Sequence, residues 1–424
     1  MMRQRPSAHI PVIAALAIGV AALSATALAL AVSAPIAAPA IVTTAHSATW
    51  QRGRYLARLG DCEACHTQTG GQPFAGGRAI PTPYGTAYTT NITPDRATGI
   101  GNWSEQDFYR AMHDGIRRDG AYLYPVFPFP SFTRMTRADV DAIFAYLQTV
   151  PAVHSSNIPN AFRWPYSARG MMKVWRALYF TPGTFKPDPK RSPTWNRGAY
   201  IVTGVAHCGA CHSPRNRLGA LVSSQALAGG TVPIDHWHAP NITPNTTFGI
   251  GKWSAADIHD FLATGHSPKG DAIGPMRGVI ESSLQHLTPA DINAIVTYVQ
   301  SVPARNGLGL AIAPPVPVDP DAGKQLYHDN CAACHGDDGR PAHPYYPGLR
   351  DNPVVQNLDP TDMILQMLHG GFQASTKANP YPYSMPPFGA SLTDAEIATL
   401  ASYVRRSFGN HAPIVWTRNV TSLR

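Results

Sequence analysis

Cysteine is scarce in this sequence. None is left for a structural disulfide or a separate redox pair, because all six cysteines belong to three short motifs. The chain also lacks a convincing phosphate-binding loop, nucleophile or general acid. Isolated polar residues such as Asp257 and His259 fit an ordinary helix surface. The chemistry of the chain therefore lies in the three motifs.

Each motif has the form Cys-x-x-Cys-His, which is typical of covalent attachment of c-type haem. The two thiols add to the haem vinyl groups, and the histidine binds the iron as its proximal ligand. A single copy would also fit a zinc half-site or a thioredoxin-like redox motif. Zinc needs more ligands at partner spacing, however, and these motifs lie over a hundred residues apart. The sequence thus predicts three covalently bound haem c groups, attached at Cys62, Cys65 and His66, at Cys208, Cys211 and His212, and at Cys331, Cys334 and His335.

Acidic residues are fewer than basic ones, which gives a formal net charge of +8. Setting aside Arg3 and Arg5 lowers this charge to +6, because no acidic residue precedes Trp50. Three haems would bring six propionates and offset most of the remainder. A basic surface for nucleic acid is therefore unsupported, and we expect no nucleic-acid partner.

An uncharged apolar stretch follows the two arginines and runs from Ile10 to Val32. It predicts either a signal peptide with a long hydrophobic region or an uncleaved membrane anchor helix, within residues 1–48. Both alternatives place the rest of the chain outside the cytoplasm, because the arginines stay inside. Covalent haem attachment in bacteria takes place in the periplasm. We therefore expect the protein on the periplasmic side of the bacterial inner membrane.

The first two thirds of the chain contain an internal repeat. The third part is shorter and lacks the middle elements of the repeat, but it keeps the Cys-x-x-Cys-His motif and a final helix. The repeated pairs are Arg52-Gly-Arg-Tyr55 with Arg197-Gly-Ala-Tyr200, Asn91-Ile-Thr-Pro94 with Asn241-Ile-Thr-Pro244, and Gly99-Ile-Gly-Asn-Trp103-Ser104 with Gly249-Ile-Gly-Lys-Trp253-Ser254.

Each part closes with a predicted amphipathic helix. A threonine is the expected N-cap, an acidic residue three positions later resembles a capping box, and apolar residues then recur at i, i+3, i+4 and i+7. These helices mark domain ends near Val150, Val302 and Phe408. The cap pairs are Thr136 with Asp139, Thr288 with Asp291, and Thr393 with Glu396; the stripes begin at Val140, Ile292 and Ile397.

The length of the chain and these boundaries predict three tandem helical domains rather than one core. We call residues 49–150, 195–302 and 321–410 the first, second and third segments. Residues 151–194 are an aromatic and proline-rich linker, residues 303–320 a second linker, and residues 411–424 a C-terminal tail. The aromatic, basic stretch within 162–180 fits a membrane surface or a partner interface, and equally a cover between two domains.

A haem iron with a proximal histidine has one further axial position. Methionine there raises the potential and closes the site, whereas an open position allows ligand binding. Met276 and Met385 stand before the closing helices and are the predicted sixth ligands. In the first segment Phe127 lies in the corresponding stretch and cannot bind iron. Met135 is one candidate there, although it equally fits the apolar partner of a helix staple; the alternatives are water, another group or a five-coordinate haem.

These motifs together resemble the triheme cytochrome c subunit of bacterial membrane-bound dehydrogenases. The resemblance covers residues 50 to 410. Besides the haem and repeat motifs, it includes Gly115-Ile-Arg-Arg-Asp-Gly120, Ser283-Leu-Gln-His-Leu287 and Met385-Pro-Pro-Phe-Gly389. It implies an all-α fold of three class I cytochrome c domains after the signal or anchor helix. It also implies His66, His212 and His335 as proximal ligands, with Met276 and Met385 as distal ones. Many relatives carry a methionine where Phe127 stands.

The resemblance implies a function as an electron-transfer subunit. A catalytic partner, which is a quinoprotein, flavoprotein or molybdoprotein, would oxidise an alcohol, aldehyde or sugar acid, and the haems would relay the electrons to ubiquinone at the membrane surface. Two other hypotheses remain open. One is a haem enzyme that uses an open first haem, and the other is a freestanding multihaem carrier that feeds a terminal oxidase.

Overall fold

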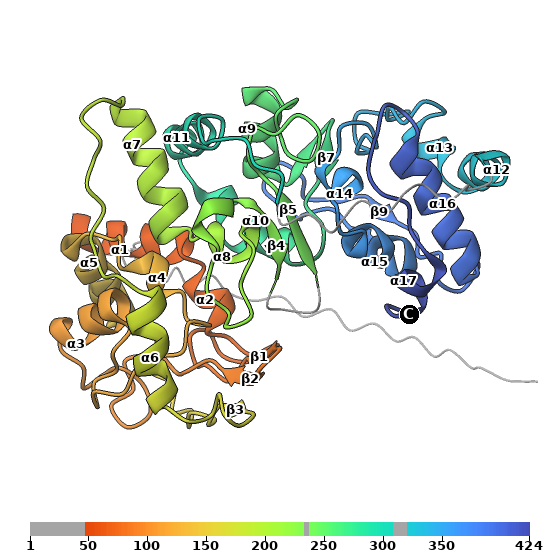
Figure 1. Ribbon diagram of the computed structural model, residues 1–424. Coiled ribbons are helices and arrows are strands. Elements are labelled where there is room, and N and C mark those ends of the chain that lie inside the picture. The colour runs from red at the N-terminus through yellow and green to blue at the C-terminus, as the bar shows by residue number, and fades with distance from the viewer. Residues whose placement is uncertain (1–46, 233–236, 308–319) are drawn as a thin grey trace, which may run out of the picture. The chain divides into compact units, whose positions relative to one another are not determined.

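The computed structural model describes residues 47–232, 237–307 and 320–424 (Figure 1). The predicted signal peptide or membrane anchor lies outside these residues. Within the three described ranges, no helix combines the length and the apolar character that are needed to cross a bilayer.

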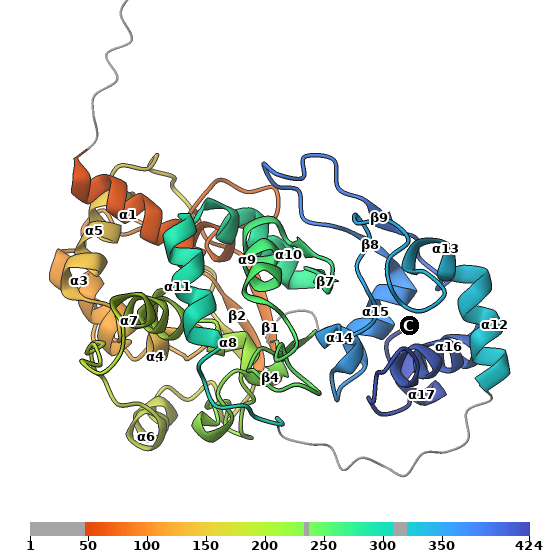
Figure 2. The same cartoon turned by 90° about the horizontal axis from the view of Figure 1, so that it is seen from above.

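Each segment is built on a pair of packed helices, one leading into the haem motif and one closing the segment (Figures 1 and 2). Glycine allows the close crossing in the first two pairs. A Cβ atom on Gly53 would lie 1.8 Å from the carbonyl oxygen of Ala142, and one on Gly198 would lie 1.9 Å from that of Ala294. The pairs are α1 Ala48–Leu59 with α5 Arg137–Leu147, α7 Pro193–Tyr200 with α11 Pro289–Val299, and α12 Pro320–Asn330 with α16 Asp394–Arg406.

The three predicted threonine caps are confirmed, since each hydroxyl accepts a hydrogen bond from the backbone N–H three residues later. Of the three closing helices, only α16 completes the capping box, in which the Glu396 carboxylate accepts a hydrogen bond from the N–H of Thr393. Asp139 and Asp291 differ. Their carboxylates turn toward arginine and tyrosine side chains instead of the caps.

Short helices and small antiparallel sheets connect these pairs. The fold is helix-rich, as expected, but the sequence did not indicate the short β-ladders. The remaining helices are α2 Cys62–Cys65, α3 Glu105–Tyr109, α4 Phe129–Phe132, α6 Gly170–Tyr179, α8 Gly209–His212, α9 Ala255–Thr264, α10 Gly274–Ser282, α13 Ala332–His335, α14 Pro353–Gln356, α15 Thr361–His369 and α17 Thr417–Thr421, with π-helical turns η1 Arg110–Asp114 and η2 Ile201–Val205 and 3₁₀ turns η3 Ser223–Gln225 and η4 Leu284–His286. The strand ladders are β1 Ala79–Thr82, β2 Gly85–Tyr88 and β3 Ala161–Phe162; β4 Ala228–Thr231 and β5 His238–Asn241; β6 His266–Ser267 and β7 Gly270–Asp271; and β8 Gly371–Phe372 and β9 Ser384–Met385.

The buried apolar side chains form two clusters. One contains residues of both the first and second segments, including Leu56, Ile143, Ile201 and Val299, so these two segments share a core. The other belongs to the third segment and includes Leu400 of the closing helix. The C-terminal tail is part of this second core, because α17 packs on α16 and the tail residues Val415 and Val420 are buried there.

Residues 151–194 are held against the segments by specific contacts. Strand β3 pairs with β2, with Gly85 opposite Phe162. Farther along, the Trp175 indole N–H donates to the carbonyl of Leu218 at 2.9 Å. The aromatic stretch therefore covers part of the first and second segments with one face and leaves its other face outward.

Candidate functional site

Each Cys-x-x-Cys-His motif forms about one turn of helix. The backbone N–H of the histidine donates to the carbonyl of the first cysteine at 2.9 Å in all three copies. Side chains at positions i, i+3 and i+4 share one face of a helix. Both thiols and the imidazole of each motif therefore face the same side, which is the arrangement that attachment of one haem requires.

The three histidines have the same second contact. The Nδ1–H donates to a backbone carbonyl at 2.6 Å from His66 to Thr90, 2.8 Å from His212 to Pro240 and 2.9 Å from His335 to Pro347. This bond fixes the tautomer and leaves Nε2 free as a ligand. Burial also lowers the pKa of all three imidazoles, which favours the neutral form that binds a metal.

The repeated Asn-Ile-Thr-Pro sequence explains two of these carbonyls. Thr90 and Pro240 each stand directly before the asparagine of the repeat. The Asn91 amide oxygen accepts both the N–H and the hydroxyl of Thr93, at 2.9 and 2.7 Å, and Asn241 makes the same pair of bonds. The repeat therefore holds the backbone segment whose carbonyl orients the proximal histidine.

The chain enters the first two motifs through a strained residue. Asp61 and His207, which immediately precede Cys62 and Cys208, have φ values of 52° and 39°. Such left-handed values are uncommon for residues other than glycine and concentrate at functional sites. Asp61 is held by the hydroxyl of Ser282, which donates at 2.5 Å, and burial raises the pKa of Asp61 to about 6.

The six thiols are free and lie in pairs within their motifs. Burial raises the pKa of Cys62, Cys208 and Cys331 to about 12, so these groups are protonated thiols at neutral pH. Reactive redox pairs instead depend on a lowered cysteine pKa. The thiols thus fit addition to a vinyl group better than disulfide exchange.

Two arginines that the sequence did not single out lie beside the first two motifs. Each guanidinium donates to the carbonyl that precedes the second cysteine, from Arg78 to Ala64 at 2.5 Å and from Arg215 to Ala210 at 2.8 Å. The Nε of Arg215 is buried and has no hydrogen-bond partner. A buried cationic donor without a partner fits an anionic group such as a haem propionate. The residues present therefore suit the haem that the motifs predict.

The predicted distal methionines occupy different elements. Met385 lies on the short strand β9, opposite Gly371, and the side-chain amide of Gln366 donates to its sulfur at 3.7 Å. Met276 lies in the first turn of α10 rather than on a loop, half-buried against the shared core. Their role as iron ligands stays a prediction.

The first segment places aromatic rings where the second has Met276. The Phe127 ring packs on Phe132 with centroids 5.4 Å apart, and Phe132 meets the ring of His207 edge-on at 5.4 Å. Met135 is fully buried in the same cluster as Val140. This burial is what the helix-staple interpretation expects of Met135.

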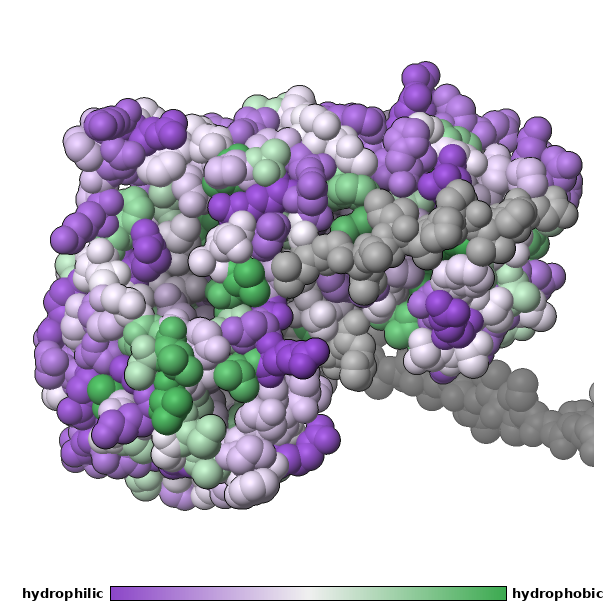
Figure 3. All heavy atoms as spheres, in the orientation of Figure 1, coloured by the Kyte–Doolittle hydropathy of each residue, from purple (hydrophilic) through white to green (hydrophobic). Residues whose placement is uncertain are grey.

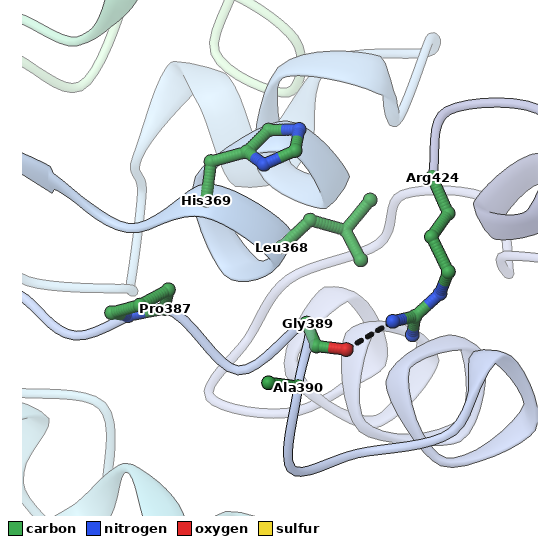
Figure 4. A pocket seen from close by; sticks show the side chains of 6 residues that line it. All are labelled: Leu368, His369, Pro387, Gly389, Ala390 and Arg424. Carbon is green, nitrogen blue, oxygen red and sulfur yellow. Dashed lines mark hydrogen bonds between the residues drawn. The ribbon is translucent and has the colours of Figure 1, made fainter.

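A surface pocket lies behind the loop that follows Met385 (Figure 4). Arg424, the last residue, donates to the carbonyl of Gly389 and closes one side of the pocket. The tail therefore fixes this loop from behind. The pocket is lined by Leu368, His369, Pro387, Gly389, Ala390 and Arg424.

In the described ranges, no group of three or more histidine, cysteine, aspartate or glutamate side chains is placed to hold a metal ion.

Known proteins resemble this chain over most of its length. Residues 50–151 and 320–407 match the cytochrome c family. The chain is 39% identical to the gluconate 2-dehydrogenase cytochrome c subunit of Pantoea cypripedii, over 90% of both chains. It is 39% identical to the cytochrome c subunit of the quinone alcohol dehydrogenase of Gluconacetobacter polyoxogenes, over 90% of this chain and 85% of that one. It is 40% identical to the fructose dehydrogenase cytochrome subunit of Gluconobacter japonicus, over 90% of this chain and 84% of that one.

Proposed function

Because this chain belongs to the cytochrome c family and its relatives are cytochrome c subunits of dehydrogenases, we propose that it is a triheme subunit that relays electrons from a catalytic dehydrogenase subunit to ubiquinone. The observation that carries the proposal is the shared geometry of His66, His212 and His335. Each imidazole donates through Nδ1 to a carbonyl and keeps Nε2 free beside two partly buried cysteines.

Haem iron, when bound, would supply one-electron transfer at each of the three sites. The chain supplies placement. Its thiols tether the group, its backbone carbonyls orient the proximal imidazoles, and Arg78 and Arg215 would hold propionates. Substrate oxidation belongs to the partner, which we propose to be a dehydrogenase acting on an alcohol, an aldehyde or a sugar acid. We place the complex on the periplasmic side of the inner membrane, because covalent haem attachment takes place there.

The number of haems tests the proposal directly. Mass spectrometry of the exported chain is expected to show three added porphyrins, because three motifs share one geometry. The double variant Cys331→Ala/Cys334→Ala is expected to carry two. Glu63→Ala, a change inside a motif at an exposed position that carries neither a thiol nor an imidazole, is expected to keep all three. Fewer than three porphyrins on the unchanged chain would contradict the triheme proposal.

The membrane partner is supported by an exposed apolar and basic surface over α6 (Figure 3). Of the thirteen large hydrophobic side chains exposed among the described residues, seven lie in residues 158–179, and Trp164 is 83% exposed. Met171, Val174 and Leu178 share one face of α6, while Met172 on the other face is buried. Residues 142–187 contain no acidic residue but five lysines and arginines. Such a helix suits the interface of an anionic bilayer.

Vesicle binding tests whether the α6 surface contacts a membrane or has only a structural role. The variant Val174→Glu/Leu178→Glu is expected to bind vesicles of phosphatidylglycerol at least about tenfold more weakly. It removes two apolar side chains that would enter the bilayer, and it adds two negative charges that the anionic lipid repels. Phe372→Glu/Tyr381→Glu, which changes two exposed hydrophobic side chains of the third segment, serves as the control and should bind as the unchanged protein does. If the Val174→Glu/Leu178→Glu variant bound vesicles as tightly as the control does, the α6 surface would have another role.

A further inference from the structure

Two reciprocal hydrogen bonds, each from a tyrosine of one segment to an aspartate of the other, join the first and second segments. We call this pair of bonds the exchange. The Tyr55 hydroxyl on α1 donates to Asp291 on α11 at 2.6 Å. The Tyr200 hydroxyl on α7 donates to Asp139 on α5 at 2.5 Å. Each tyrosine thus binds the closing helix of the other segment, and the two bonds are related by the internal repeat.

Each carboxylate also binds an arginine of its own segment. The Arg52 guanidinium donates to Asp139 at 2.5 Å, and Arg197 donates to both oxygens of Asp291 at 2.8 and 2.7 Å. Asp139 and Asp291 are 2% and 8% exposed. A buried carboxylate is stable only when charged and polar partners satisfy it. The arginine and tyrosine are therefore both needed at each aspartate.

The tyrosine hydroxyls also replace the missing half of the capping box. The backbone N–H of Thr288 donates to Tyr55 Oη at 3.3 Å, and that of Thr136 donates to Tyr200 Oη at 3.2 Å. In the third segment the Glu396 carboxylate makes this bond to Thr393 itself. The helix caps of the first two segments thus depend on a side chain from the other segment.

The third segment has none of the three residues that form the exchange, which are the arginine, the tyrosine and the aspartate. Gly323 takes the place of Gly53 and Gly198 at the helix crossing. Around it, Ala322 stands where the repeat has arginine and Gln325 where it has tyrosine. Glu396 replaces the aspartate and completes its own box. The sequence differences agree with the structure, in which the third segment has a core of its own.

The exchange lies directly behind two neighbouring haem motifs. Tyr55 and Tyr200 stand on the helices that run into Cys62 and Cys208. Beyond them, the His207 imidazole contacts the carbonyl of Gly60, with Nε2 at 3.4 Å from the oxygen, and the Ser283 hydroxyl donates to that of Leu59 at 3.2 Å. A shift of α1 against α7 would therefore move one haem site against the other.

We propose that the Tyr55–Asp291 and Tyr200–Asp139 exchange is a positioning clamp that fixes the first and second haem sites in one geometry for electron transfer between them. The inference rests on the proposed function, since it concerns electron transfer between bound haems. The third segment has no such clamp, so the first two haems form one unit and the third is attached to it by other contacts.

The variants Tyr55→Phe and Tyr200→Phe test the clamp, because each removes one hydroxyl and keeps the ring. Native-state hydrogen exchange is the first measurement. Tyr55→Phe is expected to lower the protection of the Thr288 amide by about tenfold, and Tyr200→Phe that of the Thr136 amide. Both variants should also lower the protection of α1 and α7, and the double variant should lower it further. Tyr327→Phe is the matched control. It removes a buried hydroxyl that donates to Gly336 at 2.5 Å inside the third segment, and it should leave this protection unchanged.

The haem sites supply a readout that stability alone would not move. With three haems still bound and their potentials unchanged, the double variant is expected to lose the Soret circular-dichroism couplet of the first two haems and to slow electron transfer between them. The same couplet, transfer rate and amide protection as in the unchanged protein would overturn the clamp. A chain with fewer than three haems would contradict the proposed function instead, and the amide protection would still decide the clamp.

Discussion

Replacing Arg405 with methionine is expected to destabilise the third segment by about 3–5 kcal/mol. Arg405 lies in the closing helix α16 and is fully buried. Its guanidinium donates to the carbonyls of Val355 and Asn357 at 2.9 and 2.7 Å and to that of Pro413 at 2.7 Å. Burial lowers the pKa of Arg405 to about 10. Methionine would fill much of the space but leave three buried carbonyls without a donor.

Arg406 provides a matched control, because it is the next residue of the same helix and its side chain is exposed. Arg406→Met is expected to change stability by less than about 0.5 kcal/mol. Hydrogen exchange of α12 and α16 in the haem-loaded protein reports the third segment separately from the other two. If the two variants exchanged alike, the three carbonyl bonds would contribute little to this fold.

The same arginine shows why the tail belongs to the third segment. Its bonds join the end of α14 to Pro413, and the Ser402 hydroxyl donates to the carbonyl of Val415 at 3.2 Å. Removing the guanidinium should therefore also loosen residues 411–424. The loop that follows Met385 would lose support as well, since Arg424 holds it through the carbonyl of Gly389.

The closing helices and the haem motifs were predictable because their signals are local. A threonine cap, a helical stripe and a Cys-x-x-Cys-His turn need only a few neighbouring residues. Arg405 also carried a signal. It lies eight positions after Ile397 and so falls on the buried face of α16, but a cation near a helix end is usually explained by the helix dipole.

The remaining features depend on residues far apart in the chain. The acidic position of the cap motif was predicted to serve the cap, yet Asp139 and Asp291 serve an arginine and a tyrosine from other helices. Arg215 gave no signal either, because its partner carbonyl and its buried Nε exist only in the folded chain. The proline-rich stretch before α7 was expected to link two segments, with its aromatic part at a surface or covering two domains. No local signal indicated that Phe162 pairs with a strand over seventy residues earlier.

Changing Met385 to histidine is expected to lower the potential of one haem by roughly 0.2 V, within the ~0.8 V range that axial ligands span. A thioether stabilises the reduced iron, whereas a second imidazole favours the oxidised form. The pairing of Met385 with Gly371 across β8 and β9 holds the backbone of this position in place. The variant would lose the hydrogen bond from Gln366 to the methionine sulfur.

A redox titration that resolves the three haems measures this change. Only the potential of the third haem should shift. The near-infrared absorbance band of iron–methionine coordination should lose the contribution of one haem. Gln366→Leu keeps the ligand but removes its donor, so a smaller shift of the same haem is expected. Met171→His, at an exposed position on α6, should move no potential. If Met385→His also left all three potentials in place, another group would fill the distal position of the third haem, and the placement of Met385 on β9 would be a matter of packing alone.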